Sequence, residues 1–172
     1  MGIETRIIDN FLPEEEFSKL SNTIINTKFP FYIFNKVTGN EVDENSLPFW
    51  YYYGIHVIYM DNTPKSDLFN CFDNILSYMR DQGLCLGLCR IKANFYPYTE
   101  NVYEHYPHTD YDYPMYGAVL SLNTCNGFTR LVDGTKVDSV ANRLLIFDSS
   151  KNHNSSTTSN ARGRYNVNFN FR

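Results

Sequence analysis

Residues 164–171 read Arg-Tyr-Asn-Val-Asn-Phe-Asn-Phe, and this strict alternation decides the fold of the chain. Side chains two positions apart in a β-strand point to the same face of a sheet. One face of this strand therefore carries a tyrosine, a valine and two phenylalanines, and the other carries an arginine and three asparagines. The apolar face predicts a packed core, and the polar face, if directed inward, implies a wet or ligand-filled cavity.

Short extended segments separated by turn residues fill the chain from residue 84 onward. They lie at residues 84–97, 104–110, 116–123, 127–132, 136–140, 143–148 and 164–171. Many short strands with intervening turns are typical of an antiparallel sandwich or barrel. We expect further strands at residues 4–8 and 29–59, the latter interrupted by a turn at residues 38–40 and by Pro48.

Two helices are expected before most of these strands. Pro13 and the three glutamates that follow it suit a helical first turn, and apolar residues from Phe17 to Ile25 follow helical spacing. A second helical pattern begins at Thr63-Pro64 and ends at Gly83. The predicted fold is mainly β (α+β), with a jelly-roll (double-stranded β-helix) core, two N-terminal helices packed on one face, and one domain over residues 1–172.

Composition favours a strand-rich globular protein. Of the 172 residues, 14 are tyrosine and 13 are phenylalanine, whereas the net charge is only −4. The segment from Gly127 onward carries seven basic and three acidic residues, so its charge is opposite to that of the rest of the chain. The four cysteines lack paired CxxC spacing, no signal peptide opens the sequence, and no apolar run is long enough to span a membrane. We therefore expect reduced thiols and a cytoplasmic protein with no membrane partner.

The tripeptide His108-Thr109-Asp110 is the first candidate metal motif. In an extended strand, the imidazole of His108 and the carboxylate of Asp110 point to one face. His153, which follows the apolar strand at residues 143–148, offers a second imidazole. Two histidines and one carboxylate form the facial triad of non-haem Fe(II) sites. Arg164, at the head of the alternating strand, could hold a carboxylate through two parallel hydrogen bonds.

Several neighbouring residues compete for these roles. Asp112 shares the strand parity of His108, and Arg162 shares that of Arg164. His105 has the opposite parity, which directs it toward substrate or solvent in a regular strand, although Pro107 can disturb that register. His56 is expected to be an ordinary core or surface histidine.

These motifs together resemble the Fe(II)/2-oxoglutarate-dependent dioxygenases, within them the prolyl 4-hydroxylase-like group, and most of all its small, single-domain, phage-type members. The similarity covers residues 90–171, with a weaker similarity over residues 9–25. It implies that His108, Asp110 and His153 bind Fe(II), and that Arg164 binds the distal carboxylate of the cosubstrate 2-oxoglutarate. O2 would be the oxidant, and ascorbate could support turnover.

The resemblance extends to Asn94-Phe95-Tyr96-Pro97, where it implies that Tyr96 places its phenol near the cosubstrate. One position departs from the pattern, because the strand at residues 117–123 offers Ser121 where related hydroxylases often have a tyrosine. Whether Ser121 or Arg162 assists 2-oxoglutarate binding is left open.

The resemblance favours a protein or peptide substrate with a prolyl-type target, in the host cytoplasm if a phage encodes the chain. A nucleobase or a small molecule is the alternative, and so is a jelly-roll module that keeps its ligands without turnover. Two aromatic segments, residues 50–53 and 111–116, could contact the substrate or simply close the core.

Overall fold

The computed structural model describes residues 3–35, 47–81, 83–84 and 87–172. The predicted turn at residues 38–40 lies outside the described residues. In chain order the elements are β1 (Arg6–Ile8), α1 (Glu14–Ile24), β2 (Tyr32–Phe34), β3 (Tyr53–Met60), β4 (Thr63–Pro64), the 3₁₀ helix η2 (Asp67–Phe72), α2 (Asp73–Asp81), β5 (Leu88–Pro97), β6 (Tyr116–Ser121), β7 (Phe128–Leu131), β8 (Lys136–Asp138), β9 (Leu144–Asp148), β10 (His153–Ser155) and β11 (Gly163–Phe171).

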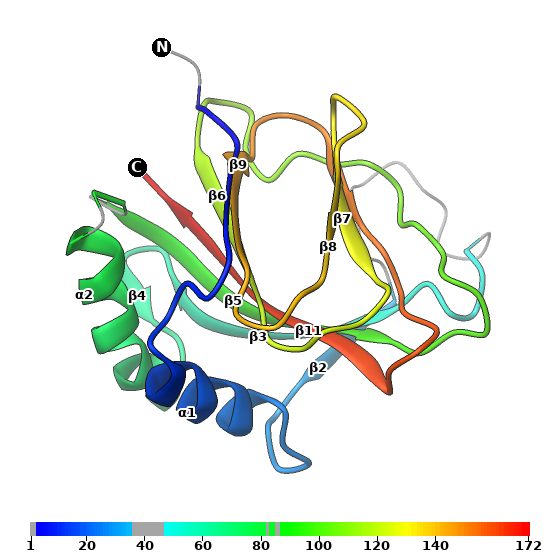
Figure 1. Cartoon of the computed structure of the whole chain (residues 1–172), viewed down its shortest axis with the longest axis horizontal. Helices are drawn as coiled ribbons and strands as arrows, with labels where there is room; N and C mark the ends of the chain where they lie inside the picture. The colour runs from blue at the N-terminus through cyan, green and yellow to red at the C-terminus, as the bar shows by residue number, and fades with distance from the viewer. Residues whose placement is uncertain (1–2, 36–46, 82, 85–86) are drawn as a thin grey trace.

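The strands form a large and a small antiparallel sheet. The large sheet has the order β1-β9-β6-β11-β5-β3-β2, with β4 paired to β3, and the small sheet has the order β10-β7-β8. Figure 1 shows β7 and β8 facing β6 and β9 across the interior of the molecule. The expected mainly β, jelly-roll architecture is confirmed.

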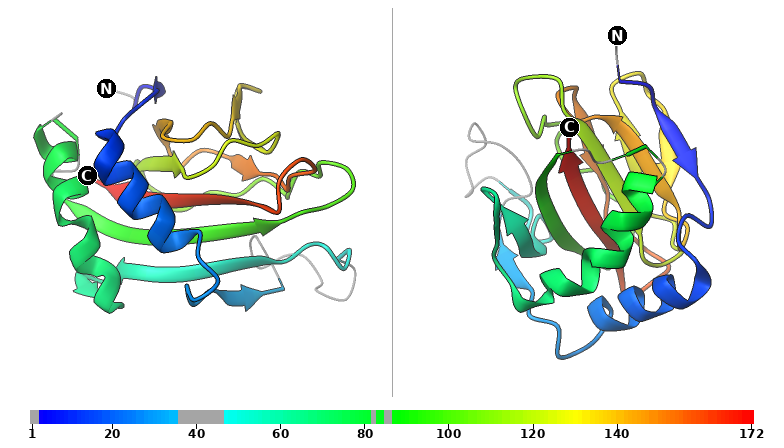
Figure 2. Two further views of the ribbon diagram at one scale, coloured as in Figure 1. Left: turned by 60° about the horizontal axis from the view of Figure 1, so that its bottom comes forward. Right: turned by 90° about the vertical axis from the view of Figure 1, so that its left-hand side faces the viewer.

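Both helices pack on the outer face of the large sheet (Figure 2). Phe17, Leu20 and Ile24 of α1 and the apolar face of α2 join strand residues such as Val167 and Phe169 in one buried cluster. This cluster takes the apolar face of β11 and leaves its polar face to the opposite side, toward the small sheet. None of the helices in the described residues is both long enough and apolar enough to cross a membrane.

The second helix differs from its prediction at its start. Thr63–Pro64 pair with the end of β3 as strand β4, and the 3₁₀ helix begins only after Ser66, whose hydroxyl accepts a hydrogen bond from the Leu68 amide at 3.2 Å. This helix therefore follows β3, and the description of both helices as N-terminal is slightly wrong. Gly83 has φ +71°, which suits a glycine at the end of a helix, as predicted.

The segment at residues 104–110 is not the regular strand that was expected. It makes only isolated bridges, Glu104 to Ser156 and His108 to His153. Conversely, His153 opens the short strand β10, which was not among the expected strands. Pro107 explains the first difference, because a proline cannot donate a ladder hydrogen bond.

Candidate metal centre

The floor of the candidate site is the polar face of the pair β5 and β11. The two strands are antiparallel, and Tyr96 lies opposite Arg164, Asn94 opposite Asn166, and Lys92 opposite Asn168. A narrow cavity of about 40 Å³ lies above this floor, between the two sheets. Its lining combines these residues with the predicted metal ligands: Lys92, Asn94, Tyr96, His108, Asp110, Val119, Thr129, His153, Asn154, Ser155, Arg164, Asn166 and Asn168.

The structure brings His108, Asp110 and His153 together at one end of this cavity. One ligand atom from each side chain lies within 4.8 Å of those of the other two. The backbones of His108 and His153 exchange two hydrogen bonds of 2.9 Å, and the Asp110 amide donates to the Ser149 carbonyl at 2.9 Å. His108 and Asp110 are therefore held in place by backbone hydrogen bonds to His153 and Ser149, and not by a regular strand.

Both imidazoles present a lone pair at neutral pH. The Nδ1 of His153 lies 3.0 Å from the Lys151 carbonyl, which can only accept, so Nδ1 carries the proton and Nε2 is free to bind a metal. Burial lowers the pKa of His108 to about 4, aided by the nearby His153. Burial likewise lowers the pKa of His153. Neither ring needs to lose a proton before it can coordinate a cation.

The Asp110 carboxylate is oriented by two residues from the sheet floor. Arg90 pairs with Oδ1 at 2.9 Å, and the Asn170 side chain donates to Oδ2 at 3.0 Å. Arg90 also donates to the Asn170 side-chain oxygen at 2.9 Å, so the three side chains form a closed ring. Burial opposes ionisation of Asp110, but Arg90 and the other nearby cationic groups outweigh it and hold the pKa well below its usual range.

Replacing Asn170 with alanine should lower metal affinity about 10- to 100-fold, because the side chain that orients a ligating carboxylate is lost. Metal titration of the purified protein measures this change. Asn166→Ala is the matched control, since Asn166 lies on the same face of β11 but bonds to Asn94 instead, at 2.8 Å. An equal loss of metal affinity in both variants would contradict this, because it would show that any change in β11 weakens metal binding, whether or not the side chain contacts Asp110.

Arg164 lies at the other end of the cavity, and its charge has no anionic partner among the residues that the structure describes. The side chain is only 1% exposed, and one Nη donates to the Thr129 hydroxyl at 2.8 Å. The remaining Nε and Nη1 groups are buried without a hydrogen-bond acceptor in the described residues. Unpaired buried donors on a cation are costly, so this guanidinium is suited to an anionic ligand that enters the cavity.

Two neighbours shape the space around Arg164. The guanidinium carbon lies 5.4 Å from the centre of the Tyr96 ring, as expected for a phenol near the same ligand. A Cβ on Gly127 would lie 2.8 Å from Cδ of Arg164 and 2.7 Å from the Thr157 carbonyl. Glycine is therefore required at residue 127 for the small sheet to pack over the arginine.

The competing sequence candidates lie elsewhere. Asp112 is exposed and does not join the metal cluster. Arg162 is also exposed and borders a separate surface pocket beside Ile25 and Phe31. Ser121 is buried but does not line the cavity; Val119 is the β6 residue that does. The hydroxyl that contacts Arg164 comes instead from Thr129 on β7.

The aromatic segment at residues 50–53 joins the wall next to the cavity. The rings of Tyr53 and Tyr96 stack at 5.9 Å, and Tyr51 packs edge-on against His105 at 5.1 Å. His105 is only 2% exposed, so the expectation that it faces substrate or solvent is wrong. His56 is the core histidine that was expected, with its two ring nitrogens 2.8 Å from the Pro30 carbonyl and the Ser66 hydroxyl.

His105 should make the protein sensitive to acid. Burial lowers its pKa to about 3 from an ordinary 6.5. Between these two pH values His105 is protonated in the unfolded chain but neutral in the folded chain. The free energy of unfolding therefore decreases as the pH falls from 6.5 toward 3. We expect His105→Asn to flatten the plot of unfolding free energy against pH by up to about 1.4 kcal/mol per pH unit in that window. Denaturant titrations at several pH values test this, and parallel wild-type and variant curves would contradict it.

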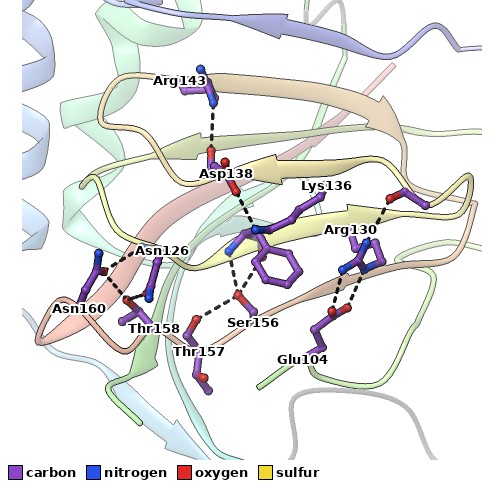
Figure 3. A network of polar contacts seen from close by, with 12 residues as sticks. Glu104, Asn126, Arg130, Lys136, Asp138, Arg143, Ser156, Thr157, Thr158 and Asn160 are labelled. Carbon is purple, nitrogen blue, oxygen red and sulfur yellow. Dashed lines mark hydrogen bonds and ion pairs between the residues drawn. The ribbon is translucent and has the colours of Figure 1, made fainter. Parts of the chain in front are cut away.

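The segment that leads into His108 is anchored to the small sheet. Figure 3 shows Glu104 held by a bidentate ion pair to Arg130, with both N–O distances 2.8 Å. The Asn154 side chain donates to the same carboxylate at 3.0 Å. The hydrogen bonds with Arg130 and Asn154 lower the pKa of Glu104, although burial opposes them. These contacts connect the segment before His108, one predicted metal ligand, with β10, the strand that carries the other predicted histidine ligand, His153.

This chain is similar to known proteins in its structure and not in its sequence. No family model matches the sequence, and no curated protein sequence matches it. A Pseudomonas putida prolyl-4-hydroxylase superposes with a TM-score of 0.60 and 21% identity, over 99% of this chain and 94% of its own. A prolyl hydroxylase from Trichoplax adhaerens, in complex with a hypoxia inducible factor peptide fragment, gives a TM-score of 0.62 and 20% identity, over 97% and 83% of the two chains.

Another structure with a similar fold is that of the epimerase SnoN in complex with Fe3+, alpha ketoglutarate and nogalamycin RO. Its TM-score is 0.62 at 11% identity, over 98% of this chain and 78% of its own. This chain has the 2-oxoglutarate oxygenase fold. Because the same fold supports both prolyl hydroxylases and an epimerase, the fold alone does not identify a substrate.

The sequence alone did not single out four residues that line the cavity or contact the side chains in it: Arg90, Lys92, Thr129 and Asn170. The first two share the strand parity of Tyr96, and Asn170 shares that of Arg164, so the alternation did contain a signal for three of them. Thr129 had none, because its contact with Arg164 joins the two sheets.

Proposed function

We propose that this chain is an Fe(II)- and 2-oxoglutarate-dependent oxygenase that hydroxylates a C–H bond of a protein or peptide. One observation carries the proposal: a three-ligand metal cluster and a buried, unpaired guanidinium share one cavity in an oxygenase fold. Two neutral imidazoles and one carboxylate suit Fe(II) and leave coordination positions open. The distal carboxylate of 2-oxoglutarate would supply the anionic partner that Arg164 does not have among the described residues.

Iron and 2-oxoglutarate, when bound, supply the oxidising chemistry by coupling O2 reduction to decarboxylation of 2-oxoglutarate to succinate. The protein's residues bind and orient these groups. His108, Asp110 and His153 would hold the metal, and Arg164, supported by Thr129, would fix the far end of the cosubstrate. Tyr96 and Tyr53 form an aromatic wall that excludes water from the same space.

Exposed aromatic side chains near the cavity support a peptide substrate. Trp50 stacks on Tyr103 at 4.5 Å, and Tyr103 is partly exposed, as is Tyr106. Tyr111 and Tyr113 form a second pair at 5.4 Å directly after the metal-binding tripeptide. Aromatic-lined grooves bind extended, proline-containing peptides. A small-molecule substrate is the second candidate, because the SnoN structure holds nogalamycin RO in the same fold.

Reconstitution tests the proposal. The protein is loaded with Fe(II) without oxygen and supplied with 2-oxoglutarate, ascorbate and O2, and succinate is measured. Proline-containing peptides, oligonucleotides and small aromatic acids are then screened for a mass gain of one oxygen. We expect iron-dependent succinate formation and oxygen incorporation into a peptide. Tight metal binding without any succinate would support a non-catalytic binding module instead.

A further inference from the structure

Lys92 lies in the same cavity as the metal cluster but is not used by it. It occupies the middle of β5, opposite Asn168 of β11, and its ammonium lies 5.6 Å from the centre of the Tyr53 ring. Lys92 makes no hydrogen bond or ion pair with any residue that the structure describes. It lines the same cavity as His108, Asp110 and His153.

The charges in and around the cavity do not balance. Arg90, Lys92 and Arg164 are cationic, whereas Asp110 is the single carboxylate among the described residues that line the cavity. Bound Fe(II) and 2-oxoglutarate would bring charges of +2 and −2, so three cationic side chains would still face one carboxylate, a net charge of +2. Asp110 pairs with Arg90, the distal carboxylate of 2-oxoglutarate is assigned to Arg164, and Lys92 has no anion assigned to it.

The floor beside Lys92 is also built for a polar ligand. The side-chain oxygens of Asn94 and Asn168 are buried without a hydrogen-bond partner among the described residues. Asn94 is 3% exposed and Asn168 is 7% exposed, and both line the cavity. Buried amides without partners are expected to bond to a ligand or to water. These oxygens accept hydrogen bonds, so they require donor groups of a ligand or water, whereas Lys92, which lines the same cavity, is the group that could bind an anion.

We propose that Lys92 binds a carboxylate of the substrate next to the metal, so that the substrate is acidic close to the carbon that reacts. The proposal rests on the proposed function and names its substrate class. Lys92 offers a single ammonium, and the neighbouring guanidinium of Arg90 already pairs with Asp110, so the site suits a singly charged carboxylate better than a phosphate. The carboxylate comes from an aspartate or glutamate side chain of a peptide or from a small organic acid, and the experiment separates the two.

Binding to the non-reacting complex tests this inference without turnover. The protein is loaded with Mn(II) and 2-oxoglutarate in the absence of oxygen and titrated with proline-containing peptides that differ only by aspartate or asparagine. Acetyl-aspartate and a phosphoserine peptide are the other probes. We expect the aspartate peptide to bind at least about tenfold more tightly than the asparagine peptide. Equal binding of acetyl-aspartate and the aspartate peptide would identify a small acid as the source.

Variants of Lys92 make the test specific. Lys92→Gln should remove the preference for aspartate, Lys92→Arg should retain it, and Lys92→Glu should favour a lysine peptide. Lys65→Gln is the matched control, because Lys65 lies outside the cavity and contacts Asp61 at 3.8 Å. Thermal melting of each apo variant shows that the fold persists.

Two results would overturn the inference while leaving the proposed function intact. One is a wild-type complex that binds 2-oxoglutarate but does not distinguish aspartate from asparagine, or that prefers the phosphoserine peptide. The other is a Lys92→Gln variant that loses 2-oxoglutarate affinity and keeps the peptide preference, since Lys92 would then serve the cosubstrate. If the wild-type, metal-loaded protein does not bind 2-oxoglutarate at all, the proposed function itself fails.

Discussion

Replacing Arg164 with methionine should reduce 2-oxoglutarate affinity by at least about a hundredfold while sparing the metal. Two charge-assisted hydrogen bonds to a buried carboxylate contribute about 1.5–3 kcal/mol each, and both are lost. The metal cluster at the other end of the cavity makes no contact with this side chain. Calorimetric titration of 2-oxoglutarate into the metal-loaded variant measures the first effect, and metal titration of the apo protein measures the second.

The same substitution should not destabilise the apo protein. The guanidinium is 1% exposed and two of its donor groups lack acceptors, so the folded apo state carries an uncompensated buried charge. Methionine removes that charge and fills much of the same space, and we expect an equal or higher melting temperature together with loss of the stabilisation by 2-oxoglutarate. Arg162→Met is the matched control. If Arg162 proved essential for 2-oxoglutarate binding and Arg164 did not, the assigned register of β11 would be wrong.

Replacing His153 with alanine should abolish metal binding, with a loss of affinity well beyond the 10- to 100-fold expected of a residue that only orients a ligand. The variant removes one of three donor groups, and 2-oxoglutarate affinity should fall with it because the cosubstrate chelates the metal. His105→Asn is the control, since His105 is a buried histidine nearby whose Nδ1 lies 3.0 Å from the Ser155 hydroxyl. Metal titration should separate the two variants, and equal affinities would remove His153 from the metal site.

Much of the fold follows from local pattern. The alternation at residues 164–171 predicted both the strand and its two faces, because successive side chains of a strand point to opposite faces of the sheet. The apolar face packs under the helices, and Arg164, Asn166 and Asn168 line the cavity. The grouping of His108, Asp110 and His153 also follows from the sequence, through residue type and order.

The parts that the sequence did not reveal depend on contacts between distant segments. Pro107 and the pairing of His108 with His153 replace the expected strand at residues 104–110, and the same change buries His105 beneath Tyr51. The second helix begins late because Thr63–Pro64 find a partner in β3. No local pattern contains these pairings, which is why the Thr129 contact and the environment of His105 required the structure.

The central claim is that one cavity holds a metal on His108, Asp110 and His153 and an anion on Arg164. The most direct test is an oxygen-free crystal structure of the protein with Mn(II) and 2-oxoglutarate. The account predicts one anomalous peak bounded by the two imidazoles and the Asp110 carboxylate, with the distal carboxylate of 2-oxoglutarate on Nε and Nη1 of Arg164. A metal peak elsewhere, or a cosubstrate carboxylate paired with Arg162, would contradict it.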